Sequence, residues 1–279
     1  MIKTALIGHP VAHSLSGVIH NAAFKSLGID GKYEVIDVPS GKLPNVIDKL
    51  IKEGYSGFNV TIPYKVDVKN FLSMSDMFAD YAGCTNCVKI KPNGVLYGYN
   101  TDIYGFSHAI PEDIRNNLKG TKILILGNGG AARAVAVGLG MLEVSQIDFR
   151  VRDFDKAQPL CNSISSIFPN TSINLIKIID NISQYSIIVN TTPLGTVGEN
   201  QNKIPIASSL LANADKSALV YDLVYNPVET VLIKTAKSYG LKTVGGLDML
   251  IGQAVKGFKI FTGKDADFDL MKNAALKYL

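Results

Sequence analysis

The chain has 279 residues, above the roughly 100 to 200 of a single domain, so two domains are expected. A content of 47% hydrophobic and 19% charged residues excludes a disordered tail protein, and the apolar runs are too short to cross a bilayer. The formal charge of +4 is scattered along the chain without a basic cluster, so no nucleic-acid or membrane partner is predicted.

The N-terminus and the cysteines indicate a reducing compartment. The first residues lead directly into a predicted strand, without the apolar core of a signal peptide, and three cysteines cannot all pair. We therefore expect a cytoplasmic protein. Cys84 and Cys87 form a C-x-x-C without a second pair, and His9, His13 and His20 have no carboxylate at ligand spacing, so no metal site is predicted.

Short β-branched runs alternate with helical stretches along the chain. Strands are predicted over 4–7, 33–38, 57–60, 122–126, 146–150, 187–190, 218–223 and 241–244. Helices are predicted over 18–27, 42–53, 131–141, 155–167, 230–239 and 248–262. This rhythm is typical of an α/β protein with buried, mostly parallel strands. A polar segment at 116–120, before a fresh strand and a glycine-rich turn, places a domain boundary near residues 105–120.

A glycine-rich loop follows the strand predicted over 122–126. Its sequence, Gly127-Asn128-Gly129-Gly130-Ala131-Ala132, matches G-x-G-x-x-A between a strand and a helix. Gly127 permits the tight turn, Gly129 lets the backbone approach a pyrophosphate, and Ala132 allows close helix packing. The loop therefore predicts a Rossmann-type dinucleotide-binding domain whose helix N-terminus receives the pyrophosphate.

The end of the next strand should select between NADP and NAD. Arg150 and Arg152 favour a 2′-phosphate, whereas Asp153 would accept a 2′-hydroxyl and repel a phosphate. NADP is preferred on this balance, and NAD stays open. The same charges could also be a solvated strand end.

Polar clusters are expected at strand ends in the N-terminal half, at 8–16, 59–65, 83–86 and 98–102. Each alone is typical of a turn or a helix cap. Because ligands bind at the carboxyl ends of strands in open α/β sheets, the four clusters together predict a binding site.

Six motifs, in order, resemble those of the shikimate dehydrogenase family, and the resemblance runs from end to end. They are HSLS at 13–16 with His20-Asn21, GFNVTIPYK at 57–65, GYNTD at 98–102, NTTPLG at 190–195, YDLVYNP at 221–227 and GLDMLIGQ at 246–253. The resemblance implies a substrate-binding catalytic domain over 1–105, completed by C-terminal helices over 246–279, and an NADP-binding Rossmann domain over 106–245. It implies the reversible reduction of 3-dehydroshikimate to shikimate with NADPH, in the chorismate pathway to aromatic amino acids.

The resemblance also assigns roles to individual residues. Lys65 and Asp102 would form the catalytic pair, and Ser14 and Ser16 would hold the substrate carboxylate. The other substrate-binding residues would be Asn59, Thr61, Asn86, Tyr225 and Gln253, with Asp102 bonding to the substrate as well. The cofactor would lie against Gly127, Asn128, Gly129, Gly130, Ala131, Arg150, Arg152, Thr191, Leu223 and Gly246. The chemistry agrees, since a ketone that receives hydride needs a proton donor or fixed cation such as Lys65 at its oxygen.

Some positions depart from the family pattern, and alternatives follow from them. Val151-Arg152-Asp153 stands where Asn-Arg-Thr is usual, which weakens the NADP assignment, and Ile103 replaces a small residue. A relative that oxidises quinate or an amino-substituted analogue, with NAD or NADP, is one alternative, although the Ser14 and Ser16 pair favours shikimate. A non-catalytic nucleotide-binding regulator is another, which the presence of Lys65 disfavours. The oligomeric state stays open, and a homodimer is compatible with the sequence.

Overall fold

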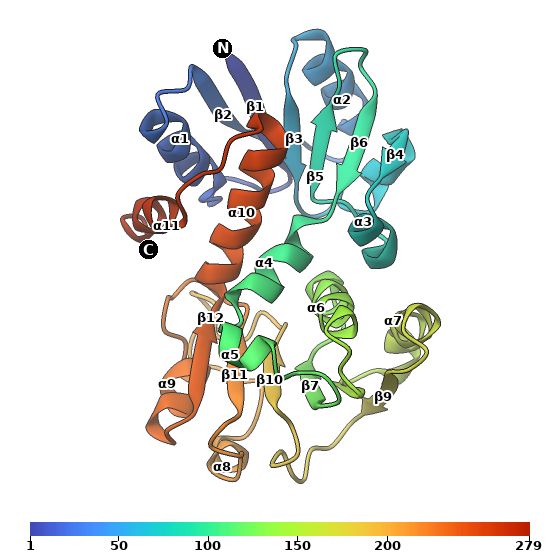
Figure 1. The fold of residues 1–279 in the computed structure, drawn as a ribbon, viewed down its shortest axis with the longest axis vertical. Helices are drawn as coiled ribbons and strands as arrows, with labels where there is room; N and C mark the ends of the chain where they lie inside the picture. Colours follow the sequence, from blue (N-terminus) through green and yellow to red (C-terminus); the bar gives the residue numbers. More distant parts are fainter. The chain divides into compact units, whose positions relative to one another are not determined.

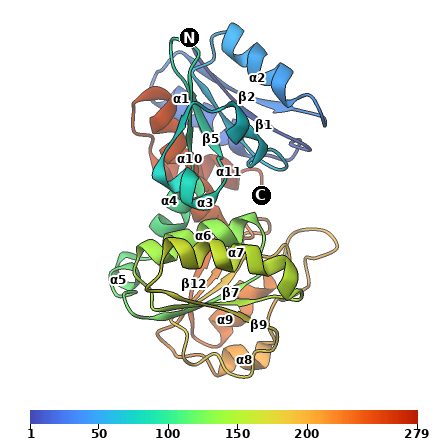
Figure 2. The same ribbon diagram turned by 90° about the vertical axis from the view of Figure 1, so that its right-hand side faces the viewer.

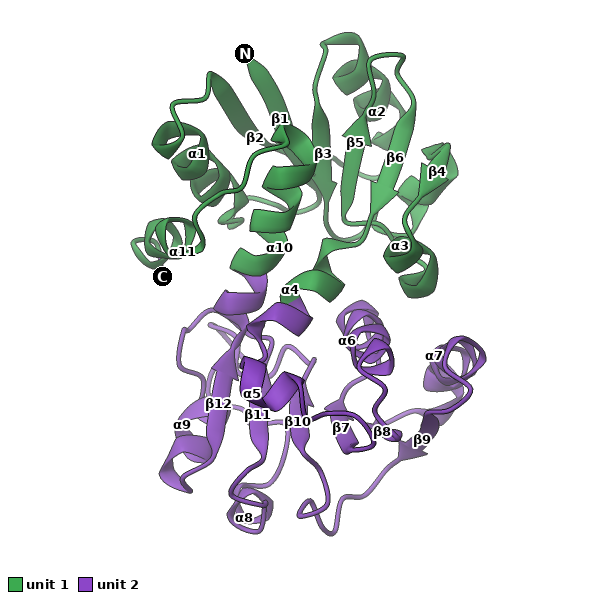
Figure 3. Ribbon diagram, viewed as in Figure 1, with its two compact units in different colours: residues 1–105, 251–278 green, residues 106–250, 279 purple.

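The computed structural model describes residues 1–279 and divides them into two compact units (Figure 3). Unit 1 comprises residues 1–105 and 251–278, and unit 2 comprises residues 106–250 and Leu279. Each unit contains a six-stranded sheet with helices packed on it (Figure 1). None of the helices combines the length and the apolar character that a bilayer crossing needs. The predicted α/β fold class is confirmed.

The sheet of unit 1 mixes parallel and antiparallel pairs. Its strands are β1 (Ile2–Gly8), β2 (Gly31–Asp37), β3 (Gly57–Val60), β4 (Met74–Ser75), β5 (Cys87–Ile90) and β6 (Leu96–Tyr99), in the order β2-β1-β3-β5-β6-β4. β1 pairs with β2 and β3 in parallel, whereas β5 runs antiparallel to both β3 and β6. The hairpin of β5 and β6 was not predicted, although Asn93-Gly94 between the two strands is a turn signal and Gly94 has φ +78°.

The helices of unit 1 bury apolar residues against the sheet or, as α11 does, against another helix. They are α1 (Ser16–Ser26), α2 (Leu43–Lys52), α3 (Met77–Ala82), most of α4 (Thr101–Ala109) and of α10 (Gly246–Thr262), α11 (Phe268–Leu276), and a 3-10 turn over Asp67–Phe71. On α2 the buried residues Leu43, Ile47 and Leu50 follow the i, i+4, i+7 spacing of an amphipathic helix. They pack into a core that includes Phe58 and Val88 of the sheet.

Unit 2 has a fully parallel sheet. Its strands are β7 (Lys122–Leu126), β8 (Gln146–Arg150), β9 (Ser172–Ile176), β10 (Ile187–Asn190), β11 (Leu219–Asp222) and β12 (Lys242–Gly245), in the order β12-β11-β10-β7-β8-β9. Its helices are α5 (Glu112–Arg115), α6 (Gly130–Met141), α7 (Phe154–Ile167), α8 (Ser208–Ala212) and α9 (Val231–Ser238). α6 and α7 cover one face and α9 the other (Figure 2). This is the doubly wound strand order of dinucleotide-binding sheets, which reverses between β7 and β10.

Candidate active site

The sheet edge of unit 1 where β3 ends carries most of the residues predicted to bind substrate. Asn59 lies on β3, Thr61 follows it, and Asp102 is in the first turn of α4, directly after β6. The expectation that segment 83–86 follows a strand was wrong, because it lies between α3 and β5. β5 is antiparallel to β3, with Cys87 opposite Asn59, so Asn86 still lies at this edge.

Lys65 and Asp102 form an ion pair. Lys65 Nζ lies 2.7 Å from Asp102 Oδ2, and the two side chains are 31% and 18% exposed. Asn86 holds the other carboxylate oxygen, since its Nδ2 donates to Asp102 Oδ1 at 2.8 Å. The carboxylate is therefore fixed by a buried amide on one side and bonds to the ammonium on the other.

Two opposing effects act on the pKa of Lys65. Burial lowers the pKa, while the charge of Asp102 and its hydrogen bond raise it, and the net result is a pKa above the usual value for lysine. The amine is therefore protonated at neutral pH. A group in this state can donate a proton to a developing alkoxide.

Asn100 positions Asp102, a role that was not predicted. Its Oδ1 accepts from the backbone N–H groups of Asp102 and Ile103 at 3.1 and 3.3 Å, which makes it the N-cap of α4. Its Nδ2 donates to the carbonyl oxygen of Cys84 at 3.1 Å. Asn100 belongs to the GYNTD motif, and an asparagine just before a helix is a capping signal from which this role could have been predicted. Ile103 is buried, 2% exposed, within unit 1.

The remaining predicted substrate residues of unit 1 lie on α1 and α10 and in the segments just before α1 and just after β3. Gln253 on α10 joins the hydrogen-bond network of Asn86 and Asp102 through Thr101, whose Oγ1 donates to Gln253 Oε1 at 3.4 Å. Ser14 and Ser16 are joined by a bond from the Ser16 amide to Ser14 Oγ at 3.2 Å, and both side chains are partly exposed. The Thr61 amide bonds to the Ile7 carbonyl at 2.9 Å.

The glycine-rich loop of unit 2 leaves open space before α6. A Cβ on Gly129 or Gly130 would meet no atom within 4 Å, so the backbone there is accessible. Gly127 has φ +111°, and a Cβ there would lie 2.7 Å from Thr191 Oγ1, so only glycine fits. The exposed first amides of a twelve-residue helix suit an anion such as a pyrophosphate. The loop thus fits a dinucleotide.

The neighbouring strands bring the other predicted cofactor residues to the same edge of the sheet. Thr191 follows β10 and bonds to the Leu126 carbonyl through both its amide and its hydroxyl, at 3.0 and 2.7 Å. Gly246 packs against Leu223, where a Cβ would fall 2.1 Å from the carbonyl oxygen. Tyr225, predicted to touch substrate, also lies in unit 2, and burial raises the pKa of its phenol.

Asp222, a buried carboxylate whose role was not predicted, connects the ends of β10 and β11 with the start of α9. Asp222 at the end of β11 is 0% exposed and accepts from Asn190 Nδ2 at 2.8 Å and from Thr230 Oγ1 at 2.6 Å. The amide of Val224 donates to it as well, at 3.1 Å. Burial raises the pKa of Asp222, and the hydrogen bonds oppose that shift.

Asp153 has a structural role at the end of β8. Its side chain accepts from the amide of Lys156 at 3.1 Å and so caps α7, and it pairs with the Lys156 ammonium at 3.4 Å. Arg152 is exposed and Arg150 partly exposed, which leaves both guanidinium groups open to a ligand. The sequence left open whether Asp153 selects the cofactor or belongs to a solvated strand end, and its role as a helix cap was not predicted.

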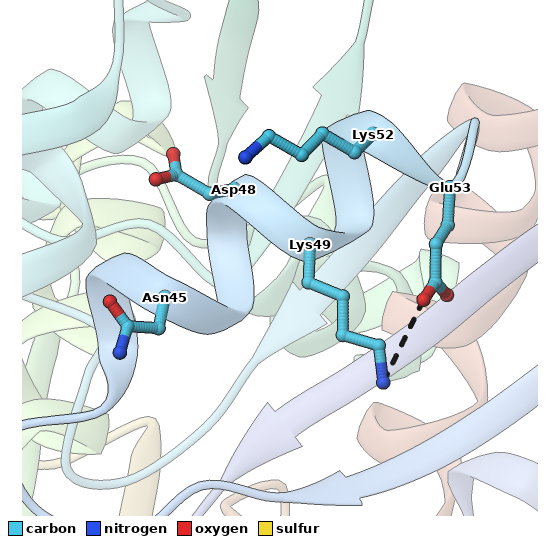
Figure 4. A pocket seen from close by; sticks show the side chains of 5 residues that line it. All are labelled: Asn45, Asp48, Lys49, Lys52 and Glu53. Carbon is cyan, nitrogen blue, oxygen red and sulfur yellow. Dashed lines mark ion pairs between the residues drawn. The ribbon is translucent and has the colours of Figure 1, made fainter.

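Other polar features lie away from these two edges. No group of three or more histidine, cysteine or acidic side chains is placed to hold a metal ion, and Cys84 and Cys87 are buried free thiols. A hollow on the outer side of α2 is lined by exposed polar side chains, with Lys49 Nζ paired to Glu53 Oε1 at 3.7 Å (Figure 4). It contains none of the predicted site residues.

Comparison with known proteins finds family profiles that match two parts of the chain and relatives that match most of it. The family profile described as "Shikimate dehydrogenase substrate binding domain" matches residues 6–88, and "Shikimate 5'-dehydrogenase C-terminal domain" matches residues 246–276. The shikimate dehydrogenase (NADP(+)) of Caldanaerobacter subterraneus subsp. tengcongensis is 38% identical over 95% of this chain and 93% of its own length.

Two solved structures are similar over nearly the full length. Shikimate 5-dehydrogenase from Thermus thermophilus, in complex with NADP(H) and shikimate, has a TM-score of 0.86 and 32% identity, with 100% of each chain covered. Quinate dehydrogenase from Corynebacterium glutamicum, in complex with NAD, has a TM-score of 0.91 and 31% identity, with 99% of each chain covered. The chain belongs to the shikimate dehydrogenase family.

Proposed function

We propose that the protein catalyses the NADP-dependent, reversible reduction of 3-dehydroshikimate to shikimate. The observation that carries this proposal is the Lys65–Asp102 pair, with its 2.7 Å contact, at the sheet edge shared with Asn59, Thr61 and Asn86. The name of the 38% identical relative supports the reaction and the cofactor.

In unit 1, each predicted residue has a task suited to its chemistry. Ser14 and Ser16 bind the substrate carboxylate, and Asn59, Thr61, Asn86 and Gln253 bond to its hydroxyl and carbonyl groups. Lys65 Nζ transfers a proton to the carbonyl oxygen as that oxygen gains charge, and Asp102 holds the ammonium in place. In the reverse direction the same nitrogen takes the proton back.

In unit 2, Gly127, Asn128, Gly129, Gly130 and Ala131 would hold the pyrophosphate, while Arg150 and Arg152 would pair with the 2′-phosphate. Thr191, Leu223 and Gly246 would line the rest of the cofactor site. When bound, the reduced nicotinamide supplies the hydride. The contact of Tyr225 with substrate, a homodimeric assembly and a cytoplasmic location stay predictions.

A second candidate is the oxidation of quinate with NAD, which the structural similarity to a quinate dehydrogenase in complex with NAD brings into consideration. Quinate carries an additional hydroxyl on the carbon that bears the carboxylate, so the residues around that group would have to accommodate it. The paired Ser14 and Ser16 hydroxyls favour shikimate. A non-catalytic regulator would bind the nucleotide but turn over neither substrate.

Initial rates of nicotinamide reduction test the proposal. We expect rapid oxidation of shikimate with NADP, slower oxidation of quinate, and slower rates with NAD. Lys65→Ala should lower kcat by about 10² to 10⁴, the usual share of a general acid–base, whereas Lys69→Ala, which removes a nearby lysine, should not. Faster turnover of quinate with NAD would establish the second candidate, and cofactor binding without turnover would establish the regulator.

A further inference from the structure

Tyr33 on β2 is held from three directions. Its side chain is 3% exposed, and the His20 ring of α1 stacks on it with centroids 4.2 Å apart and 6° between the planes. Asn21 clamps its backbone, donating from Nδ2 to the Tyr33 carbonyl at 2.9 Å and accepting from its amide at 2.8 Å. The His20-Asn21 pair thus fixes the backbone and the ring of one tyrosine.

The Tyr33 hydroxyl reaches two predicted substrate-binding residues. It donates to Asn59 Oδ1 at 2.8 Å, and the Ser16 side chain lies beside the same phenol. β1 lies between β2 and β3 (Figure 1). The Tyr33 side chain therefore crosses one strand to reach Asn59. Two strand spacings amount to about 9.5 Å, a span suited to a long, rigid side chain with a terminal hydroxyl.

The bonds of Asn59 leave its amide only one orientation. Its Nδ2 donates to the carbonyl oxygen of Asn86 at 3.0 Å, and a carbonyl oxygen can only accept. The NH₂ group therefore faces Asn86, and Oδ1 faces the tyrosine. Burial raises the pKa of Tyr33 well above its usual value, so the phenol keeps its proton and remains a donor to Oδ1.

These contacts form one line through the site of unit 1. Asn59 bonds to the backbone of Asn86, and the Asn86 side chain bonds to Asp102, which pairs with Lys65. The Tyr33 phenol stands at the other end of that line, beside Ser16. It is a buried tyrosine at a fixed position that the reaction itself does not use.

We propose that Tyr33 is a positioning residue that acts through Asn59, by locking the Asn59 carboxamide in the orientation in which it meets the substrate. This inference rests on the proposed function. Without the phenol hydroxyl, Asn59 Oδ1 loses its donor, and the carboxamide is held only by its bond to the Asn86 carbonyl and is less tightly fixed. Substrate binding should weaken, whereas proton transfer from Lys65 should not.

A double-mutant cycle of Tyr33→Phe and Asn59→Ala tests the proposal. Tyr33→Phe keeps the ring and its stacking on His20, and should raise KM for shikimate about five- to tenfold, with kcat and KM for NADP within about twofold. In the Asn59→Ala background the same substitution should change KM by less than about twofold, because the group it acts through is gone.

Tyr64→Phe is the matched control. Tyr64 is also buried, 5% exposed, and its hydroxyl donates to the Val38 carbonyl at 2.8 Å. It should lower the midpoint of thermal unfolding about as much as Tyr33→Phe while leaving KM for shikimate within about twofold. Equal effects of the two substitutions on KM, or full additivity of Tyr33→Phe with Asn59→Ala, would overturn the proposal and leave a purely structural tyrosine.

Two further measurements keep the test decisive. If Tyr33→Phe does not accumulate as folded protein, Asn21→Ala replaces it. Asn21→Ala removes the two bonds to the Tyr33 backbone and retains the phenol. Its effect on KM for shikimate should again be smaller in the Asn59→Ala background. The unsubstituted protein is assayed first with shikimate and NADP. An inactive unsubstituted protein refutes the proposed function, whereas an active one with an additive cycle refutes only the role of Tyr33.

Discussion

Burial and a neighbouring carboxylate shift the pKa of Lys65 in opposite directions. The carboxylate prevails and the pKa of the amine is raised, so the amine stays protonated until the pH passes its usual value of about 10.4. In Asp102→Asn the opposing charge is lost while the burial remains, so the pKa should fall below that value. The basic limb of kcat/KM against pH, in the direction of ketone reduction, should therefore move to lower pH.

The pH profile of this variant needs a control pair. Asp113→Asn removes the carboxylate of an exposed ion pair, in which Asp113 Oδ2 lies 3.0 Å from Lys242 Nζ. This substitution should leave the pH profile unchanged. If the basic limb stays in place in Asp102→Asn, it reflects the titration of a group other than Lys65.

The raised pKa of Lys65 also makes the stability of the fold depend on pH. The raised pKa stabilises the fold below about pH 10.4, and the contribution is lost as the pH rises through the folded-state pKa.

The contact between Lys65 and Asp102 was predictable from the sequence, and the residues that fix the surrounding side chains and loops were not. Lys65 and Asp102 are 37 positions apart, and the motifs alone placed them in one pair, with the contact then seen at 2.7 Å. Tyr33 and Asp222 carry no motif signal of their own, because their roles arise from neighbours on other strands. The role of Asp153 as a helix cap was not predicted because the sequence does not reveal which backbone amide its carboxylate meets.

At the scale of elements, the turn from β8 into α7 combines a helix cap with the predicted 2′-phosphate contact. The Asp153 carboxylate is occupied by the Lys156 amide and ammonium, and the exposed Arg152 precedes it. Arg152→Ala should raise KM for NADP about tenfold or more and leave KM for NAD within about threefold, because a charge-assisted bond to phosphate is lost. Asp153→Asn retains a good cap and should change either KM by less than about threefold.

Initial rates with both cofactors measure these effects. Asp267→Asn alters the corresponding cap of α11, where the side chain accepts from the Leu270 amide at 2.8 Å, and serves as the control for a change of cap alone. A tenfold gain in preference for NADP in Asp153→Asn would show that the carboxylate itself selects the cofactor.

The helices and strands that were predicted have clear apolar runs or regular apolar spacing, whereas those that were missed have weak apolar patterns. β1, β3, β7 and β10 are short and mostly buried strands, and α2 has regular apolar spacing. β9 at the sheet edge has no fully buried residue, so it lacks the apolar run of a central strand. The strands β5 and β6 were not predicted, and their antiparallel direction is set by tertiary pairing.

At the scale of the whole molecule, the chain builds unit 1 from two separate segments. The first 105 residues are completed by residues 251–278, and α11 packs on α1 through its buried Met271 and Ala275. Each unit has its own core and its own candidate binding edge. The assignment of substrate to unit 1 and of NADP to unit 2 is therefore testable one ligand at a time.

Hydrogen exchange followed by mass spectrometry makes that test. At a concentration of about 100 Kd, a ligand stabilises the state it binds by about 2.7 kcal/mol, which slows exchange wherever amides open with the bound region. NADP alone should slow exchange over 123–141 and 187–195, and shikimate alone over 14–26, 57–66 and 86–104. Arg152→Ala should weaken the first pattern only, and Asn59→Ala the second only.

The pattern of protection distinguishes the assignments from each other. Protection by shikimate confined to unit 2 would refute the role of unit 1, and protection by NADP confined to unit 1 would refute the role of the glycine-rich loop. Slower exchange over 221–227 with shikimate alone would support the predicted contact of Tyr225. Because residues 251–262 of α10 lie in unit 1 and carry Gln253, shikimate and not NADP should protect them. The return of the C-terminal helix to the first unit would then have a direct functional consequence.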